Sequence, residues 1–186
     1  MRQKKSSERI GWREAGFIIV AFAAILLSTT LIFSGREDVG RTVEDASLVN
    51  LEDLSTEGFV QVRPDANVVE GRGVISLTGN CYRMVAGTDE TLAESIRDGI
   101  DGVTNQRPNT HEVMRDLLES FDIDLLMVKV TELRENNFYG KIIVQRNDDI
   151  LVLDSKPSDG IGLAVRMNGT IYFNETLLKE RGQKVC

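Results

Sequence analysis

The sequence has little of what most metal and redox sites require. Its 186 residues include one histidine, two cysteines and one tryptophan. A single histidine excludes multi-histidine metal sites and two-histidine catalysis within one subunit. The phosphate loop GxxxxGK[ST], the GxSxG nucleophile elbow, the HExxH zinc motif and the CxxC pair are also absent. These absences leave most classes of enzyme without support.

A second absence concerns charge. The net charge is −7, and no basic stripe runs through the sequence. Proteins that bind nucleic acid strongly and without sequence preference normally carry such a stripe, because neutralising phosphates supplies most of their affinity. The hydrophobic fraction of 41% and the charged fraction of 27% are ordinary for a globular chain. A chain of this length holds one ordinary domain and an appendage.

The appendage is predicted at residues 15–35, which carry no charged side chain. As a helix this segment would extend about 31 Å, close to the hydrocarbon thickness of a bilayer. Trp12, next to charged residues, suits the membrane interface. A buried core helix and a cleaved signal peptide are the alternatives, but the apolar run exceeds the usual signal core and no small-x-small cleavage site follows it. We therefore expect one N-terminal transmembrane helix that anchors the chain in a membrane.

Flanking charge predicts how this helix is oriented. More basic residues precede it than follow it, with Arg2, Lys4, Lys5, Arg9 and Arg13 on one side and Arg36 and Arg41 on the other. The positive-inside rule places the N-terminus in the cytoplasm and the domain outside it. In an oxidising compartment Cys81 and Cys186 could pair, although Cys186 is the terminal residue and could equally fray.

The rest of the chain divides by composition. Residues 1–14 form a basic cytoplasmic segment, and residues 36–56 form an acidic spacer that is partly helical over 43–54. We expect one folded domain over residues 57–182, followed by a tail at 183–186.

Residues 57–182 carry both strand and helix patterns. Apolar runs and alternation predict strands at 58–63, 73–78, 81–86, 126–133, 138–146, 150–154 and 170–173. Helices are predicted after Thr88, Asn109, Asp159 and Asn174, with Gly102 ending the first of them. The turn at 78–80 predicts a hairpin. Because no βαβ unit repeats, we predict an α+β fold with a mixed or antiparallel sheet, meander strands and packed helices.

Two polar clusters lie where a helix begins. The first is Arg107-Pro108-Asn109-Thr110-His111-Glu112, and the second is Asp154-Ser155-Lys156-Pro157-Ser158-Asp159. Free N–H groups at helix starts can hold phosphate oxygens, and the oxygens of Glu112, Asp154 and Asp159 are ligands that Mg²⁺ or Mn²⁺ prefers. The same residues also suit ordinary helix caps, and a lone histidine is often structural. Spacing alone leaves both interpretations open.

Around these clusters the sequence resembles the bifunctional nuclease domain family. The resemblance is carried by RPNTHEVMRDLLESF at 107–121, FYGKIIVQ at 138–145 and LDSKPSDGIGLAVRMNGTIYFNE at 153–175. Weaker similarity extends back through TDETLAESI at 88–96 to about residue 57. The family reads RPxTHxLL and Asp-x-Arg-Pro-Ser-Asp-Ala, so Lys156 and Gly160 depart from its pattern. Lysine keeps the charge but lacks the bidentate fork of arginine.

The resemblance implies hydrolysis of phosphodiester bonds in DNA and RNA. On this hypothesis Asp154 and Asp159 hold a divalent metal with Glu112, and His111, Asp154 and Asp159 are catalytic. Arg107, Thr110, Lys156 and Ser158 would bind the substrate phosphate. The competing hypothesis is a noncatalytic module that binds an anion or a protein partner with the same residues. Strand edges left by the meander also predict a homo-oligomer.

Overall fold

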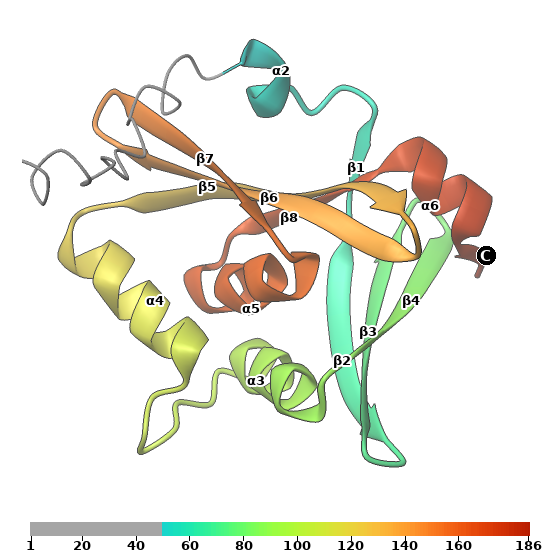
Figure 1. The fold of residues 1–186 in the computed structure, drawn as a ribbon, viewed down its shortest axis with the longest axis horizontal. Helices are drawn as coiled ribbons and strands as arrows, with labels where there is room; N and C mark the ends of the chain where they lie inside the picture. The colour runs from blue at the N-terminus through green and yellow to red at the C-terminus, as the bar shows by residue number, and fades with distance from the viewer. Residues whose placement is uncertain (1–49) are drawn as a thin grey trace, which may run out of the picture. The chain divides into compact units, whose positions relative to one another are not determined.

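The structure is a computed structural model that describes residues 50–186. These residues form a mixed α+β fold with two sheets and several helices (Figure 1), so the predicted fold class is confirmed. The expected anchor at 15–35 and most of the spacer lie outside the described residues. Within 50–186 no helix is both long enough and apolar enough to cross a bilayer. The anchor therefore stays a prediction.

Most predicted elements are present, with shifted ends. The order is α2 (Leu51–Leu54), β1 (Phe59–Gln61), β2 (Arg63–Val69), β3 (Arg72–Gly79), β4 (Tyr82–Thr88), α3 (Glu90–Ile100), α4 (Thr110–Ser120), β5 (Asp124–Arg134), β6 (Asn137–Arg146), β7 (Asp149–Ser155), α5 (Pro157–Met167), β8 (Thr170–Asn174), α6 (Glu175–Arg181) and β9 (Gln183–Lys184). The sequence interpretation missed β2, since Pro64 and Asp65 interrupt its pattern. It also placed the N-cap of α3 at Thr88, whereas the N-cap residue is Asp89.

Sheet A has five strands in the order β1-β8-β5-β6-β7. β5, β6 and β7 form the predicted antiparallel meander, and β8 lies parallel to β5. The two turns of the meander use residues with positive φ, namely Glu135 and Asn136 in the first and Asn147 in the second. α5 connects β7 to β8 and packs against β5 and β6 on one face of the sheet (Figure 1).

Sheet B has four strands in the order β2-β3-β4-β9. The chain passes from sheet A to sheet B at Val62, which is 3% exposed and donates its N–H to the carbonyl of Ile171. The predicted hairpin joins β3 to β4 through Asn80 and Cys81, both with positive φ. Residues 183 and 184, expected in a free tail, instead form β9 against β4.

One apolar core fills the space between the sheets and the helices. α3 packs against α5 and against β2 and β3, so it joins the helical layer to sheet B. The core side chains are contributed by both sheets and by α3, α5 and α6, and include Ala66, Ile75, Leu77, Ile96, Val128, Val130, Ile161, Leu163, Phe173 and Leu178. The domain is thus one packing unit, and its two sheets hold fixed positions relative to α5.

The opposite face of sheet A carries a buried lysine. Lys129 is 1% exposed, and its ammonium donates to the backbone carbonyls of Asp53 and Ser55. Burial lowers the pKa of this ammonium, and the Asp53 carboxylate opposes that shift. Asp53 also pairs with Lys141, at 2.5 Å between Oδ1 and Nζ. The end of the expected spacer is therefore part of the folded unit.

The first prediction concerns the disulfide between Cys81 and Cys186, whose Cα atoms lie 5.2 Å apart and which are separated by 105 residues in sequence. Replacing both by serine should lower the free energy of unfolding by about 2–4 kcal/mol, because a long loop is no longer closed in the unfolded chain. Urea unfolding without reductant measures this difference. Wild-type protein treated with reductant should match the variant. Equal stability of oxidised wild type and variant would contradict the disulfide.

The second prediction concerns Lys129. A chain that begins at residue 57 lacks the carbonyls of Asp53 and Ser55, so it should be less stable than a chain that begins at residue 50 by about 2 kcal/mol, the usual scale for hydrogen bonds to a charged group. Lys129→Met in the shorter chain should recover part of the loss, since no ammonium is then left unpaired. Urea unfolding of the three proteins tests this. No rescue by methionine would argue against it.

Candidate active site

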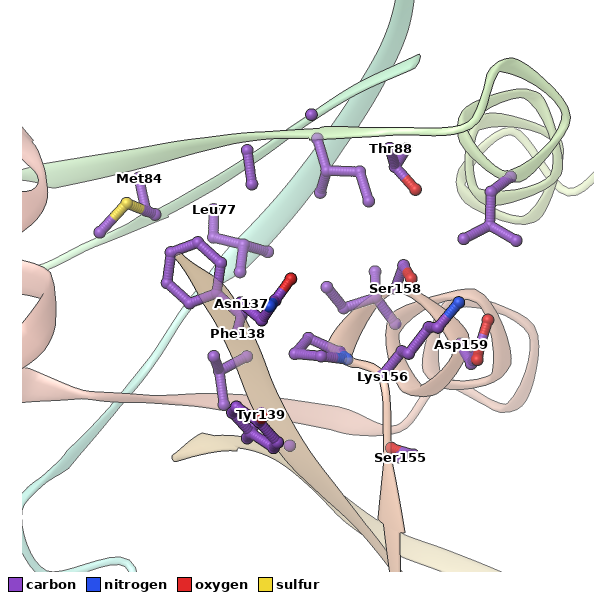
Figure 2. A pocket seen from close by; sticks show the side chains of 18 of the residues that line it. Leu77, Met84, Thr88, Asn137, Phe138, Tyr139, Ser155, Lys156, Ser158 and Asp159 are labelled. Carbon is purple, nitrogen blue, oxygen red and sulfur yellow. The ribbon is translucent and has the colours of Figure 1, made fainter. Parts of the chain in front are cut away.

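A cleft of about 1040 Å³ opens between the β3–β4 hairpin of sheet B and the β5–β6 hairpin of sheet A. The start of α5 borders it, as Figure 2 shows. Its floor is apolar and is formed by residues such as Ile75, Leu77, Met84, Val130, Ile161 and Phe173. Its rim is polar and includes Arg72, Thr88, Asp89, Glu132, Arg134, Asn137, Lys141, Asp154, Ser155, Lys156, Ser158 and Asp159.

The start of α5 leaves the backbone N–H of Ser158 available to a ligand, whereas the N–H groups of Asp159 and Gly160 donate to the carbonyl of Lys156. Lys156 is the N-cap residue, with an extended backbone, and its side chain makes no capping hydrogen bond. Pro157 occupies the first helical position, where a missing N–H costs nothing and the fixed φ favours the helix. The helix dipole adds partial positive charge there. This end of the cleft therefore suits a phosphate oxygen better than an uncharged group.

Four predicted residues of the second cluster meet at the cleft, namely Asp154, Lys156, Ser158 and Asp159. Figure 2 shows the side chains of Lys156, Ser158 and Asp159 at the start of α5. Ser155 adds a buried hydroxyl that has no hydrogen-bond partner within the described residues. The sequence interpretation treated Ser155 only as a cap, and nothing in its local pattern distinguishes it from one.

Asp154 and Asp159 reach the cleft from different directions. Neighbouring residues of a strand point to opposite faces. Asp154 is in register with Lys141, whereas Ser155 is in register with Gly140. Asp154 thus shares its sheet face with Lys141, the face on which Asp53 lies. Across residues 50–186 no three side chains of His, Cys, Asp and Glu come together in a group able to hold a metal ion.

The first cluster lies away from the cleft. None of Arg107, Thr110, His111 and Glu112 is among its lining residues. Arg107 and Thr110 are exposed to solvent near the start of α4, whereas His111 and Glu112 are buried at 5% and 1% exposure. The sequence placed the two clusters on equal terms, but the fold brings only the second one to the cleft.

Glu112 caps its own helix. Its two carboxylate oxygens accept the backbone N–H groups of Asn105 and Asn109, at 3.1 and 2.7 Å. In return the Asn109 side chain accepts the N–H of Glu112, which completes the predicted capping box. The N–H of Asn109, and then that of Asn105, lower the pKa of Glu112. With both oxygens engaged and no place in the cleft, Glu112 does not join Asp154 and Asp159 as the predicted third metal ligand.

His111, in α4, is packed against α3 and α5. Its Nδ1 lies 2.8 Å from the hydroxyl of Ser95 in α3, and its ring lies against Gly162 of α5. A Cβ added at Gly162 would sit 2.6 Å from ring atoms of His111. Burial is the main cause that lowers the pKa of His111; Arg166 adds to this, and Asp159 and Glu112 oppose it. In this arrangement the neutral imidazole positions α5 and does not face the cleft.

The walls of the cleft were not anticipated from the sequence. Arg72 and Thr88 come from the β3–β4 hairpin, and Arg134 and Asn137 come from the β5–β6 hairpin. Arg134 pairs with Glu132 at 2.9 Å and lies over the ring of Tyr139. No local motif marks these residues, because their roles arise from two hairpins meeting in three dimensions.

Comparison with known proteins supports the family resemblance that the sequence motifs indicate. A family model described as the bifunctional nuclease domain matches residues 84–185. An uncharacterized protein of Mycobacterium tuberculosis is 35% identical over 96 residues, which cover 52% of this chain and 56% of that protein. Bifunctional nuclease 1 of Oryza sativa subsp. japonica is 23% identical over 156 residues, covering 78% of this chain and 46% of that protein. The chain thus spans about half the length of these curated relatives.

The third prediction isolates the titration of His111, the only histidine in the chain. Because its pKa is lowered on folding from 6.5, the unfolded chain takes up the proton first. Stability is therefore fully present above about pH 6.5 and falls as the pH drops below it. Urea unfolding between pH 7.5 and 5 should show this decline in wild type and a flatter profile in His111→Gln. Parallel profiles would contradict burial of a neutral imidazole.

Proposed function

Because the chain belongs to the bifunctional nuclease domain family, we propose that it hydrolyses phosphodiester bonds in DNA and RNA at the cleft beside α5. The observation that carries this proposal is the uncapped start of α5. There the second cluster of the family pattern surrounds the free backbone N–H of Ser158 and the positive end of the helix dipole, at one end of the cleft. A binding site for a phosphate oxygen and a set of ionisable side chains therefore coincide within the matched segment.

Each residue at this junction receives a role from its chemistry. Lys156 and Ser158 bind the phosphate, the latter through its hydroxyl and its backbone N–H. Asp159 lies in the first turn of α5 and lines the cleft, so it accepts a proton from the attacking water and returns it to the leaving oxygen of the cleaved ester. The apolar floor and the 40% exposed ring of Tyr139 suit stacking with unpaired bases. Single-stranded nucleic acid is the substrate that this surface favours.

A divalent cation fits this proposal. Mg²⁺ usually keeps several water ligands and binds through one or two carboxylates together with substrate phosphates. Asp159 would be one such carboxylate, since Asp154 points to the opposite face of sheet A, and the unpartnered hydroxyl of Ser155 lies on the face that α5 covers. The ion, when bound, would supply a Lewis acid that stabilises charge on the phosphate oxygens.

The first cluster supports the site from a distance. We infer that His111 holds α5 through Gly162, since its ring fills the space where a Cβ would stand. Arg107 and Thr110, exposed beyond the cleft, would contact a longer substrate along its backbone. Their contribution would then be to substrate affinity, with no effect on the chemical step.

A noncatalytic binding module is the second candidate function. The net charge of −7 favours it, as does the presence of Asp89, Glu132, Asp154 and Asp159 around the cleft. In that case Lys156 and the start of α5 would hold a small anion or an acidic group of a protein partner. Such binding would proceed without a metal and without cleavage.

We also propose that the chain is tethered to a membrane by residues 15–35, with its domain on the extracytoplasmic side. The basic residues before this segment support that orientation. The disulfide between Cys81 and Cys186 supports it independently, because disulfides persist in oxidising compartments. Digestion of intact cells by added protease would test the orientation.

The fourth prediction tests catalysis with labelled single-stranded DNA and RNA, with Mg²⁺ or Mn²⁺ and with chelator. Wild type should cut only with metal. Asp154→Asn combined with Asp159→Asn should reduce the rate by about 100-fold or more, the scale expected for losing acid–base or electrostatic assistance. Asp122→Asn is the matched control, because Asp122 is an exposed acid outside the cleft. It should cut at the wild-type rate.

The outcomes separate the candidate functions. Equal cutting by wild type and the double variant would place the chemistry elsewhere. Folded wild type that binds the oligonucleotide but never cuts it would favour the noncatalytic module. His111→Gln should retain most of the activity once its loss of stability is taken into account, since the imidazole does not line the cleft.

A further inference from the structure

β7 forms one edge of sheet A (Figure 1). It pairs with β6 on one side, and within residues 50–186 no strand pairs with its other side. An unpaired edge presents free N–H and C=O groups that another strand can join. Proteins usually block such an edge with a proline, a lysine, a bulge or a very short strand. β7 has seven residues, DILVLDS, and an unbroken register with β6.

The other sheet edges in the described part of the chain are protected. β1 has three residues and β9 has two. β2 is longer, but Arg63, Pro64 and Asp65 occupy its first half. β4 is also unpaired beyond Arg83, but this free part, residues 84–88, has five residues and contains Gly87. β7 is therefore the longest of these edges without proline or lysine. This contrast indicates that the edge of β7 is occupied in the assembled protein.

The side chains of β7 point to the same conclusion. Residues 150–153 are all apolar. Leu151 is 44% exposed and Leu153 is 43% exposed. Because they are two residues apart on a strand, both leucines point to one face of the sheet. They lie opposite the buried residues Val144 and Ile142 of β6, so the apolar face of sheet A continues to its edge.

We propose that β7 pairs with β7 of a second copy of this chain, antiparallel and centred on Val152. The segment Leu151-Val152-Leu153 reads the same in both directions. In this register Leu151 lies opposite Leu153 of the partner subunit, and the reverse pair forms by symmetry. Such an interface is isologous, as a two-fold axis requires. It joins the two five-stranded sheets into one continuous sheet and covers four leucines.

Charge selects this register over its neighbours. With the axis at Val152, Asp149 lies opposite Ser155 of the partner subunit, and Asp148 lies beside Lys156 of the partner subunit. Moving the axis to Leu151 would place Asp148 opposite Asp154 of the partner subunit, and like charges directly opposed are destabilising. Moving it to Leu153 would leave Leu151 opposite Ser155 of the partner subunit and would separate Asp148 from Lys156 of the partner subunit. The register centred on Val152 pairs Leu151 with Leu153 and places Asp148 beside Lys156, and it opposes no two like charges, although Ile150 then lies opposite Asp154 of the partner subunit.

The pairing brings the second copy to the rim of the cleft. Asp154, Ser155 and Lys156 end β7 and line the cleft. The turn between β6 and β7 of the partner subunit therefore borders each cleft, with Asp148 of the partner subunit next to Lys156. Each site then contains an acidic side chain that one chain alone does not supply.

The fifth prediction uses Val152→Cys in the full-length chain purified in detergent. A residue on the two-fold axis faces its own copy, so mild oxidation should produce a disulfide-linked dimer on a non-reducing gel. The native cysteines do not interfere, because Cys81 and Cys186 are paired with each other. Ile150→Cys is the matched control on the same strand. It faces Asp154 of the partner subunit in this register and should remain uncrosslinked.

A second measurement guards against a crosslink formed by chance collision. Light scattering should show that Leu151→Asp with Leu153→Asp converts the dimer to monomer without loss of folded structure, since both side chains are already exposed. Leu117→Asp, at an apolar residue that is 55% exposed on α4, should leave the dimer intact. Monomeric wild type, equal crosslinking at Ile150→Cys, or dissociation by Leu117→Asp alone would each overturn the proposal.

Discussion

Helix α5 can lie between sheet A and the other helices because glycine occupies two of its inward positions. A Cβ at Gly160 would stand 2.7 Å from Val128 of β5, and a Cβ at Gly162 would stand 2.6 Å from His111 of α4. Both approaches are closer than side-chain carbons tolerate, so the helix is held on two sides at once. Its start, with Lys156 and Pro157, is thereby fixed beside the cleft. The chemistry of the site depends on this packing.

The sequence predicted what is local and missed what is assembled from distant segments. The capping box of Asn109 and Glu112 follows from their spacing. The helix after the polar stretch 154–159 was also predicted, although it begins earlier than expected, at Pro157. Spacing does not tell which side of α4 faces the protein, so His111 appeared catalytic although it is buried against α3 and α5. The cleft itself lies between hairpins that are far apart in the chain, and no pattern predicts their meeting.

Electrostatics limits how the cleft can hold an anion. Two of its cations have partners already, since Arg134 pairs with Glu132 and Lys141 pairs with Asp53. Among the described residues no ion pair is found for Lys156, the cation at the start of α5. A site that neutralises few phosphates shows a shallow dependence of affinity on salt. Lys156 and the backbone N–H of Ser158 then carry much of the recognition.

The disulfide between Cys81 and Cys186 gives the domain an unusual covalent shape. It closes a ring that contains the whole chain from the β3–β4 turn to the C-terminus, including α5 and both polar clusters. Residues 101–108, between α3 and α4, are all exposed and present a natural point of attack for a protease. One cut there would open the ring without separating the pieces. The domain can thus exist as a nicked, two-fragment protein that keeps its cleft.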